Sequence, residues 1–179
     1  MYNLGIVKTL SKENRNPALL LTQANEIFYE NVPRNVFISM IYGLFNLKDN
    51  TMTVASAGHN PLIFVKKQNK QAELLNPRGI ALGLDKGEIF NSVIEEKLIP
   101  VEQGDVFVFY TDGVSEAMNP NLECFGEKRL TETINNFSHL SAKNILNKIT
   151  DSVLTFTDKA PQHDDFTLVV VKAKSPKNE

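Results

Sequence analysis

One segment organises the chain: Phe107-Val108-Phe109-Tyr110-Thr111-Asp112-Gly113-Val114-Ser115-Glu116-Ala117. The apolar run from Val106 to Tyr110 is too short for a helix and rich in β-branched and aromatic residues, which predicts a strand buried on both faces. Gly113 allows a sharp turn with positive φ directly after the strand. We therefore expect Asp112 to stand at the rim of a sheet, open to solvent, metal or substrate.

A second segment near the C-terminus has the same arrangement in reverse order, with acidic residues first and an apolar run after them. Asp164-Asp165 precedes an apolar run, Phe166 to Val171, that also predicts a buried strand. If the two strands are antiparallel neighbours, Asp112, Asp164 and Asp165 converge at one edge. Like charges held a few ångströms apart repel each other, so such a cluster requires a cation. Carboxylate oxygens favour Mg²⁺, Mn²⁺ or Ca²⁺ over zinc.

The remaining apolar patterns predict an α+β protein. Helices are expected over residues 1–10, from the Asn16 cap and Pro17 to before Pro33, from Phe125-Gly126 onward, and after the Ser141 cap. Further strands are expected at Val36–Phe45, Thr51–Ala57, Leu62–Val65, Ala72–Leu75 and Ile89–Leu98. This order favours an α-β-β-α sandwich of two mostly antiparallel sheets flanked by helices.

Composition narrows the class of protein. With 179 residues and 42% hydrophobic residues, the chain fits one globular domain over residues 1–174, followed by a disordered tail at 175–179. The net charge of -2 gives no basis for binding nucleic acid or an anionic membrane. Cys124 is the single cysteine, no apolar run approaches the ~18 residues of a membrane span, and no signal peptide is visible. We expect a cytoplasmic protein.

Several short motifs occur in a characteristic order. They are Ala57-Gly58-His59-Asn60-Pro61, Leu82-Gly83-Leu84, Gly104-Asp105, Tyr110 to Ala117, Phe125-Gly126, and Gln162-His163-Asp164-Asp165 with the strand that follows. Together they resemble the sporulation stage II E (SpoIIE) branch of the metal-dependent, protein phosphatase 2C-like (PPM) superfamily, over roughly residues 16–172. The resemblance implies two antiparallel sheets flanked by helices and a Mn²⁺ or Mg²⁺ centre at one edge.

The resemblance also assigns roles to individual residues. Asp112 and Asp164 match the family's metal ligands, and Asp165 matches a supporting position. Catalysis would then proceed through a metal-activated water, without a protein nucleophile. Gly113, His59 and His163 are candidates for positions around the metals, although His59 also suits a structural corner and His163 a solvated loop. The implied substrate is phosphoserine or phosphothreonine on a regulatory protein, such as an anti-sigma-factor antagonist.

The sequence departs from the family pattern at its beginning. No Asp-Gly pair precedes Asp112, and the first acidic residue is Glu13. On this alignment the domain is N-terminally truncated and lacks its opening strands and one metal-ligand aspartate. Sheet edges left open in this way favour homo-oligomers, and the loss of a ligand weakens metal binding.

Two functions follow from these patterns. The first is a metal-dependent serine/threonine protein phosphatase. The alternative is a catalytically impaired fragment or pseudo-phosphatase that acts as a regulatory protein-binding module. A simple Ca²⁺-binding domain fits less well, because the chain has no Asp/Asn-rich loop with the ligand density that such a site requires.

Overall fold

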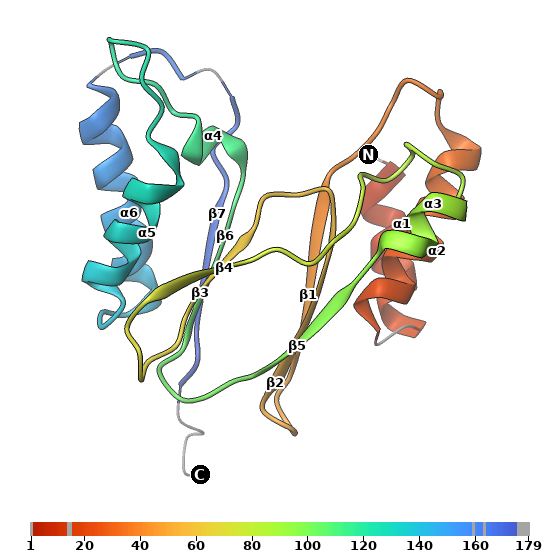
Figure 1. Cartoon of the computed structure of the whole chain (residues 1–179), viewed down its shortest axis with the longest axis horizontal. Helices are drawn as coiled ribbons and strands as arrows, with labels where there is room; N and C mark the ends of the chain where they lie inside the picture. Colours follow the sequence, from red (N-terminus) through yellow and green to blue (C-terminus); the bar gives the residue numbers. More distant parts are fainter. Residues whose placement is uncertain (1, 14–15, 159, 163, 175–179) are drawn as a thin grey trace. The chain divides into compact units, whose positions relative to one another are not determined.

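The computed structural model describes residues 2–13, 16–158, 160–162 and 164–174 (Figure 1). It divides into two compact units, each made of two pieces of chain. Unit 1 contains Met1–His59 and Asn76–Val101, and unit 2 contains Asn60–Leu75 and Glu102–Glu179. Among the described residues each unit combines an antiparallel sheet with helices. The predicted α+β class, with two antiparallel sheets and flanking helices, is confirmed.

Unit 1 contains a sheet with the strand order β1-β2-β5. Its elements are α1 (Tyr2–Glu13), α2 (Pro17–Asn31), β1 (Met40–Asn46), β2 (Thr51–Ala57), α3 (Glu88–Val93) and β5 (Glu96–Pro100). The core forms where one stripe of α2, including Leu20, Ala24 and Phe28, packs with Ala55 and Ala57 of β2. The start of α2 is as predicted, because the Asn16 side chain accepts a hydrogen bond from the Leu19 amide at 2.7 Å and Pro17 follows it.

Unit 2 contains a sheet with the strand order β4-β3-β6-β7. Its elements are β3 (Leu62–Val65), β4 (Ala72–Leu75), β6 (Val106–Tyr110), α4 (Asp112–Ser115), α5 (Gly126–Phe137), α6 (Ala142–Thr157) and β7 (Leu168–Lys172). Val106, Val108 and Tyr110 alternate along β6 and therefore share one face, which packs with buried residues of α5 and α6 such as Ile134 and Ile149. Figure 1 shows α5 and α6 side by side next to β6 and β7.

The predicted strand Ile89–Leu98 is wrong, because its first half is the helix α3 and the strand β5 begins only at Glu96. The Asp85 carboxylate accepts hydrogen bonds from the amides of Gly87, Ile89 and Phe90 at 2.8–2.9 Å. These bonds satisfy amides at the start of the helix that would otherwise lack partners. They also lower the pKa of Asp85, chiefly through the Phe90 amide.

Two other strand boundaries are also corrected. The strand predicted at Val36–Phe45 begins only at Met40, since the preceding residues form just an isolated bridge between Ile38 and Leu82. The strand predicted from Phe166 begins at Leu168. Within the described ranges, none of the helices is both long and apolar enough to cross a bilayer. The single domain over 1–174 stays a prediction, and residues 175–179 lie outside the described part.

Candidate active site

The acidic segments come together at one edge of the unit 2 sheet. Strands β6 and β7 pair antiparallel with Tyr110 opposite Leu168 and Val106 opposite Lys172. The end of β6 therefore lies beside the start of β7, as the sequence predicted. Asp112 follows the first strand and Asp164-Asp165 precedes the second, so this register carries both segments to the same edge.

Thr111 joins the two segments directly. Its hydroxyl donates a hydrogen bond to the Asp165 carbonyl oxygen at 2.8 Å and accepts one from the Thr167 amide at 2.9 Å. Its amide also donates to the Thr167 carbonyl oxygen at 3.1 Å. Sequence reasoning missed this residue. The available signal was a hydroxyl, able both to donate and to accept, between a buried strand and an Asp-Gly pair.

Gly113 is needed for close approach rather than for an unusual backbone angle. It is buried in α4, a short helical turn, and is not among the glycines with positive φ. The expected positive-φ turn at this position is therefore wrong. A Cβ atom here would overlap the Asp165 carbonyl oxygen and lie 3.2 Å from the Asp164 carbonyl oxygen. Glycine thus lets the two acidic segments touch through their backbones.

The carboxylates themselves are exposed and bonded locally. Asp112 accepts from the Gly113 amide at 3.0 Å, and Asp164 accepts from the Asp165 amide at 2.7 Å. In the part of the chain that the structure describes, no three His, Cys, Asp or Glu side chains are grouped closely enough to hold a metal ion. The structure shows that the backbones of the two segments meet, and a metal site shared by the three carboxylates stays a prediction.

The structure says less about the two candidate histidines, His59 and His163, than about the acidic residues. His59 belongs to unit 1, where its amide donates to the Ser56 hydroxyl at 3.2 Å in the corner after β2. This contact agrees with the structural alternative for His59, and its role near a metal stays a prediction. His163 lies outside the described residues.

Tyr110 anchors the strand that delivers Asp112. Its ring is 2% exposed, and its hydroxyl donates a hydrogen bond to the Glu127 carboxylate at 2.9 Å. Burial, then the hydrogen bond and charge of Glu127, raise the pKa of Tyr110 well above its usual value. The phenol is therefore a permanent donor near neutral pH, and it fixes the end of β6 to α5.

A cavity of about 610 Å³ adjoins the acidic segments within unit 2. Gly113, Glu116 and Asp164 line it together with apolar side chains that include Leu154 and Phe166. Its volume falls in the range typical of ligand pockets. A group bound at the exposed acids would thus have an apolar hollow beside it.

Sequence comparison places the chain among known proteins. The family described as Stage II sporulation protein E (SpoIIE) matches residues 3–174. The phosphoserine phosphatase RsbU of Bacillus subtilis (strain 168) is 30% identical over 170 residues, covering 93% of this chain and 48% of RsbU. Protein IcfG of Synechocystis sp. is 29% identical over 137 residues, covering 76% of this chain and 20% of IcfG. The chain thus spans about half the length of RsbU and a fifth of IcfG.

Solved structures share the fold at low sequence identity. The SiaA-PP2C domain of Pseudomonas aeruginosa matches with a TM-score of 0.81 and 14% identity, over 95% of this chain and 67% of that domain. The manganese-presoaked SpoIIE phosphatase domain of Bacillus subtilis matches with a TM-score of 0.65 and 13% identity. The match covers 99% of this chain and 76% of that chain. These structural likenesses support the fold, and the match to the family model shows which family the chain belongs to. The chain belongs to the Stage II sporulation protein E (SpoIIE) family.

Proposed function

We propose that this chain belongs to a serine/threonine protein phosphatase that hydrolyses phosphoserine or phosphothreonine on a regulatory protein, such as an anti-sigma-factor antagonist. The observation that carries the proposal is the β6–β7 register, with the Thr111 bonds that join Asp112 to Asp164-Asp165. Family membership and the likeness to a phosphoserine phosphatase add to it. The activity and partner of the whole protein are part of the proposal, because the chain spans half of RsbU.

The acidic side chains at this edge are of the chemical type that binds divalent cations. Asp112, Asp164 and, in support, Asp165 offer the hard oxygen ligands that Mn²⁺ and Mg²⁺ prefer. Three carboxylates are too few to complete a coordination shell by themselves, so water or further ligands must contribute. When bound, such a cation supplies a Lewis acid that neutralises phosphoryl charge and lowers the pKa of water.

The chain's own residues keep this edge ordered and open. Thr111 holds the segment just before β7 against the end of β6, and Gly113 lets the two backbones meet. Asp112 and Asp164 remain exposed, so a phosphorylated side chain on another protein can reach them. The adjoining cavity provides room for an apolar neighbour of that side chain.

One observation favours the alternative function, a catalytically impaired module that binds a regulatory protein. Among the described residues no group of three potential ligands is present. Two carboxylate segments alone are expected to bind Mn²⁺ weakly. The two functions differ in one measurable property, the binding of Mn²⁺ in the millimolar range.

The test is hydrolysis of a phosphoserine peptide with and without Mn²⁺. We expect Mn²⁺-dependent activity that falls at least about 100-fold in Asp112→Asn, because the amide removes a charged ligand without changing the side-chain volume. The matched control is Asp151→Asn, which makes the same change at an exposed position of α6 and should leave the activity unchanged.

Calorimetric titration with Mn²⁺ completes the experiment. Equal activity in the wild type and Asp112→Asn would remove Asp112 from the mechanism. No Mn²⁺ binding at millimolar concentration, together with no hydrolysis, would replace the phosphatase proposal by the binding module.

A further inference from the structure

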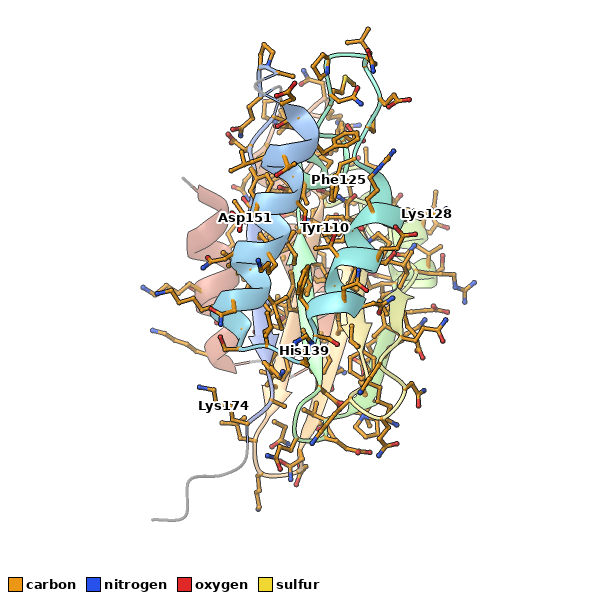
Figure 2. All side chains as sticks on the ribbon, turned by 90° about the vertical axis from the view of Figure 1, so that its left-hand side faces the viewer. Tyr110, Phe125, Lys128, His139, Asp151 and Lys174 are labelled. Carbon is orange, nitrogen blue, oxygen red and sulfur yellow. The ribbon has the colours of Figure 1, made fainter. Side chains whose placement is uncertain are left out.

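The other end of β6 and β7 has the opposite charge. A cavity of about 750 Å³ within unit 2 is lined by four lysines, Lys67, Lys70, Lys172 and Lys174, and also by His139 and Ser141. Figure 2 shows His139 and Lys174 at this end, beyond the lower ends of the helices. No Asp or Glu is among the described residues that line the cavity. The chain as a whole has a net charge of -2, so this group of four lysines is a local concentration of positive charge.

Lys172 is held in a defined position. Its ammonium group donates hydrogen bonds to the carbonyl oxygens of Ser138 and Leu140 at 2.7 and 2.6 Å. An ammonium group has three donors, so a third remains for another acceptor. Desolvation, and then the charge of Lys67, lower the pKa of Lys172. The positive charge is thus held beside a second cation rather than beside an acid.

Lys67 is positioned from its backbone and from its stem. Its amide donates to the buried Asp105 carboxylate at 2.9 Å. Its aliphatic stem lies over Gly104, where an added Cβ atom would come within 2.6 Å of the Lys67 side chain. Gly104 has a φ of 97°, so a substitution there is strained as well as crowded.

The start of α6 adds to the positive potential. Ser141 caps this 16-residue helix and lines the same cavity. The first turn of α6 carries no acidic residue, so its own side chains do not neutralise the positive end of the helix dipole. Amides at such a helix start are suited to anions, phosphate in particular.

We propose that this lysine cavity binds a small phosphate-containing anion that carries more than one negative charge, such as pyrophosphate. The cavity volume lies within the ~300–1,000 Å³ of small-molecule sites. Lysine ammonium groups recognise phosphate as point charges, and four of them match a multiply charged ligand. The four lysines line one cavity, which favours a compact ligand over an extended acidic peptide.

The site is separate from the acidic edge and does not depend on the proposed phosphatase activity. Gly104, which lines the cavity, lies just before β6, whereas Asp112 lies just after it. A five-residue strand spans roughly 17 Å at ~3.3 Å per residue. An anion in the lysine cavity would therefore leave the acidic edge accessible.

The experiment is calorimetric titration with inorganic pyrophosphate, in EDTA and at low ionic strength. We expect binding with a Kd below about 1 mM that weakens as salt is added. The double variant Lys70→Ala/Lys174→Ala should weaken binding at least about tenfold, since it removes two lining charges while leaving Lys67 and Lys172 in place. The matched control is Lys128→Ala, which removes an exposed lysine on the outer side of α5 (Figure 2) and should change the Kd less than about twofold.

Four results would overturn the inference. The first is no pyrophosphate binding at 10 mM, on the order of ten times the expected Kd. The second is equal weakening in the double variant and in Lys128→Ala. The third is a loss of binding in Asp112→Asn, which would move the anion to the acidic edge. The fourth is tighter binding of a poly-glutamate peptide than of pyrophosphate, which would assign the surface to a protein partner.

Discussion

The two ends of the β6–β7 pair are held in different ways. At the acidic end, Thr111 makes hydrogen bonds to the backbone of Asp165 and Thr167, just before β7, and the carboxylates of Asp112 and Asp164 stay exposed. At the basic end, charged side chains make the hydrogen bonds that hold the backbone. The Asp105 carboxylate is buried and accepts from backbone amides, and Lys172 donates to backbone carbonyls. Charged side chains thus help to hold the fold at the basic end, whereas the carboxylates at the acidic end make only local hydrogen bonds.

The largest expected effect comes from breaking the basic end at Asp105. Asp105→Ala removes the acceptor of the Lys67 and Glu102 amides, bonds of 2.9 and 2.8 Å at a fully buried residue. We expect the free energy of unfolding to fall by about 2–3 kcal/mol, because two donors lose their partner. Urea unfolding measures this loss.

Two variants make that experiment specific. Asp105→Asn keeps one acceptor oxygen and should lose about half as much stability. Asp151→Ala, at an exposed position of α6, should change stability by less than about 0.5 kcal/mol. Equal stability of Asp105→Ala and the wild type would show that the charge is not part of the fold at this end.

A smaller effect is expected at the acidic end. Gly113→Ala places a Cβ atom against the Asp165 carbonyl, so the two segments must separate. We expect a loss of about 1–2 kcal/mol in the free energy of unfolding, together with weaker Mn²⁺ binding. The control Gly5→Ala makes the same change in α1, where an added Cβ atom would meet nothing within 4 Å beyond its own stretch of helix, and should stabilise the protein by about 0.5–1 kcal/mol. The same sign in both variants would contradict the close approach at Gly113.

The smallest expected effect concerns Tyr110, the last residue of β6, whose hydroxyl is bonded to Glu127 of α5. Tyr110→Phe removes the 2.9 Å hydrogen bond to Glu127 and should cost about 1 kcal/mol at pH 8. The pKa of Tyr110 is raised in the folded protein, so its stabilising effect is complete below the ordinary value of 10.0 and is lost as the pH rises above it.

Urea unfolding of both proteins across this range provides the measurement. The stability advantage of the wild type over Tyr110→Phe should shrink as the pH rises past 10.0. A difference that stays constant between neutral pH and the alkaline range would contradict the raised pKa. The comparison within each pH cancels the titration of other groups.

The sequence predicted the elements whose signals are local. The caps Asn16 and Ser141 each accept a hydrogen bond from the amide three residues later, as expected. The strand Thr51–Ala57 has its predicted bounds, and β6 pairs with β7 as expected. By contrast, α3 was missed because the apolar residues around Ile89 and Phe90 suit a strand as well as a short helix. The deciding bonds came from Asp85, outside the apolar run.

The candidate site was predictable only in part. Proximity of Asp112 to Asp164-Asp165 followed from two apolar runs and one assumed pairing. The Thr111 bond to Asp165 spans 54 positions in sequence, and the direction of each carboxylate depends on its neighbouring amide. The lysine cavity draws on four separate segments, around residues 65–70, 103–104, 138–141 and 172–174, that only the folded chain brings together.

The division of the chain into interleaved pieces has a consequence for its synthesis. The hairpin of β3 and β4 emerges from the ribosome before the second piece of unit 1, and its partner β6 follows some thirty residues after β4. Until then one edge of β3 has unpaired backbone groups, which invite pairing with another nascent chain. Translation speed between residues 76 and 110 is therefore expected to influence how much of the newly made protein reaches its native state.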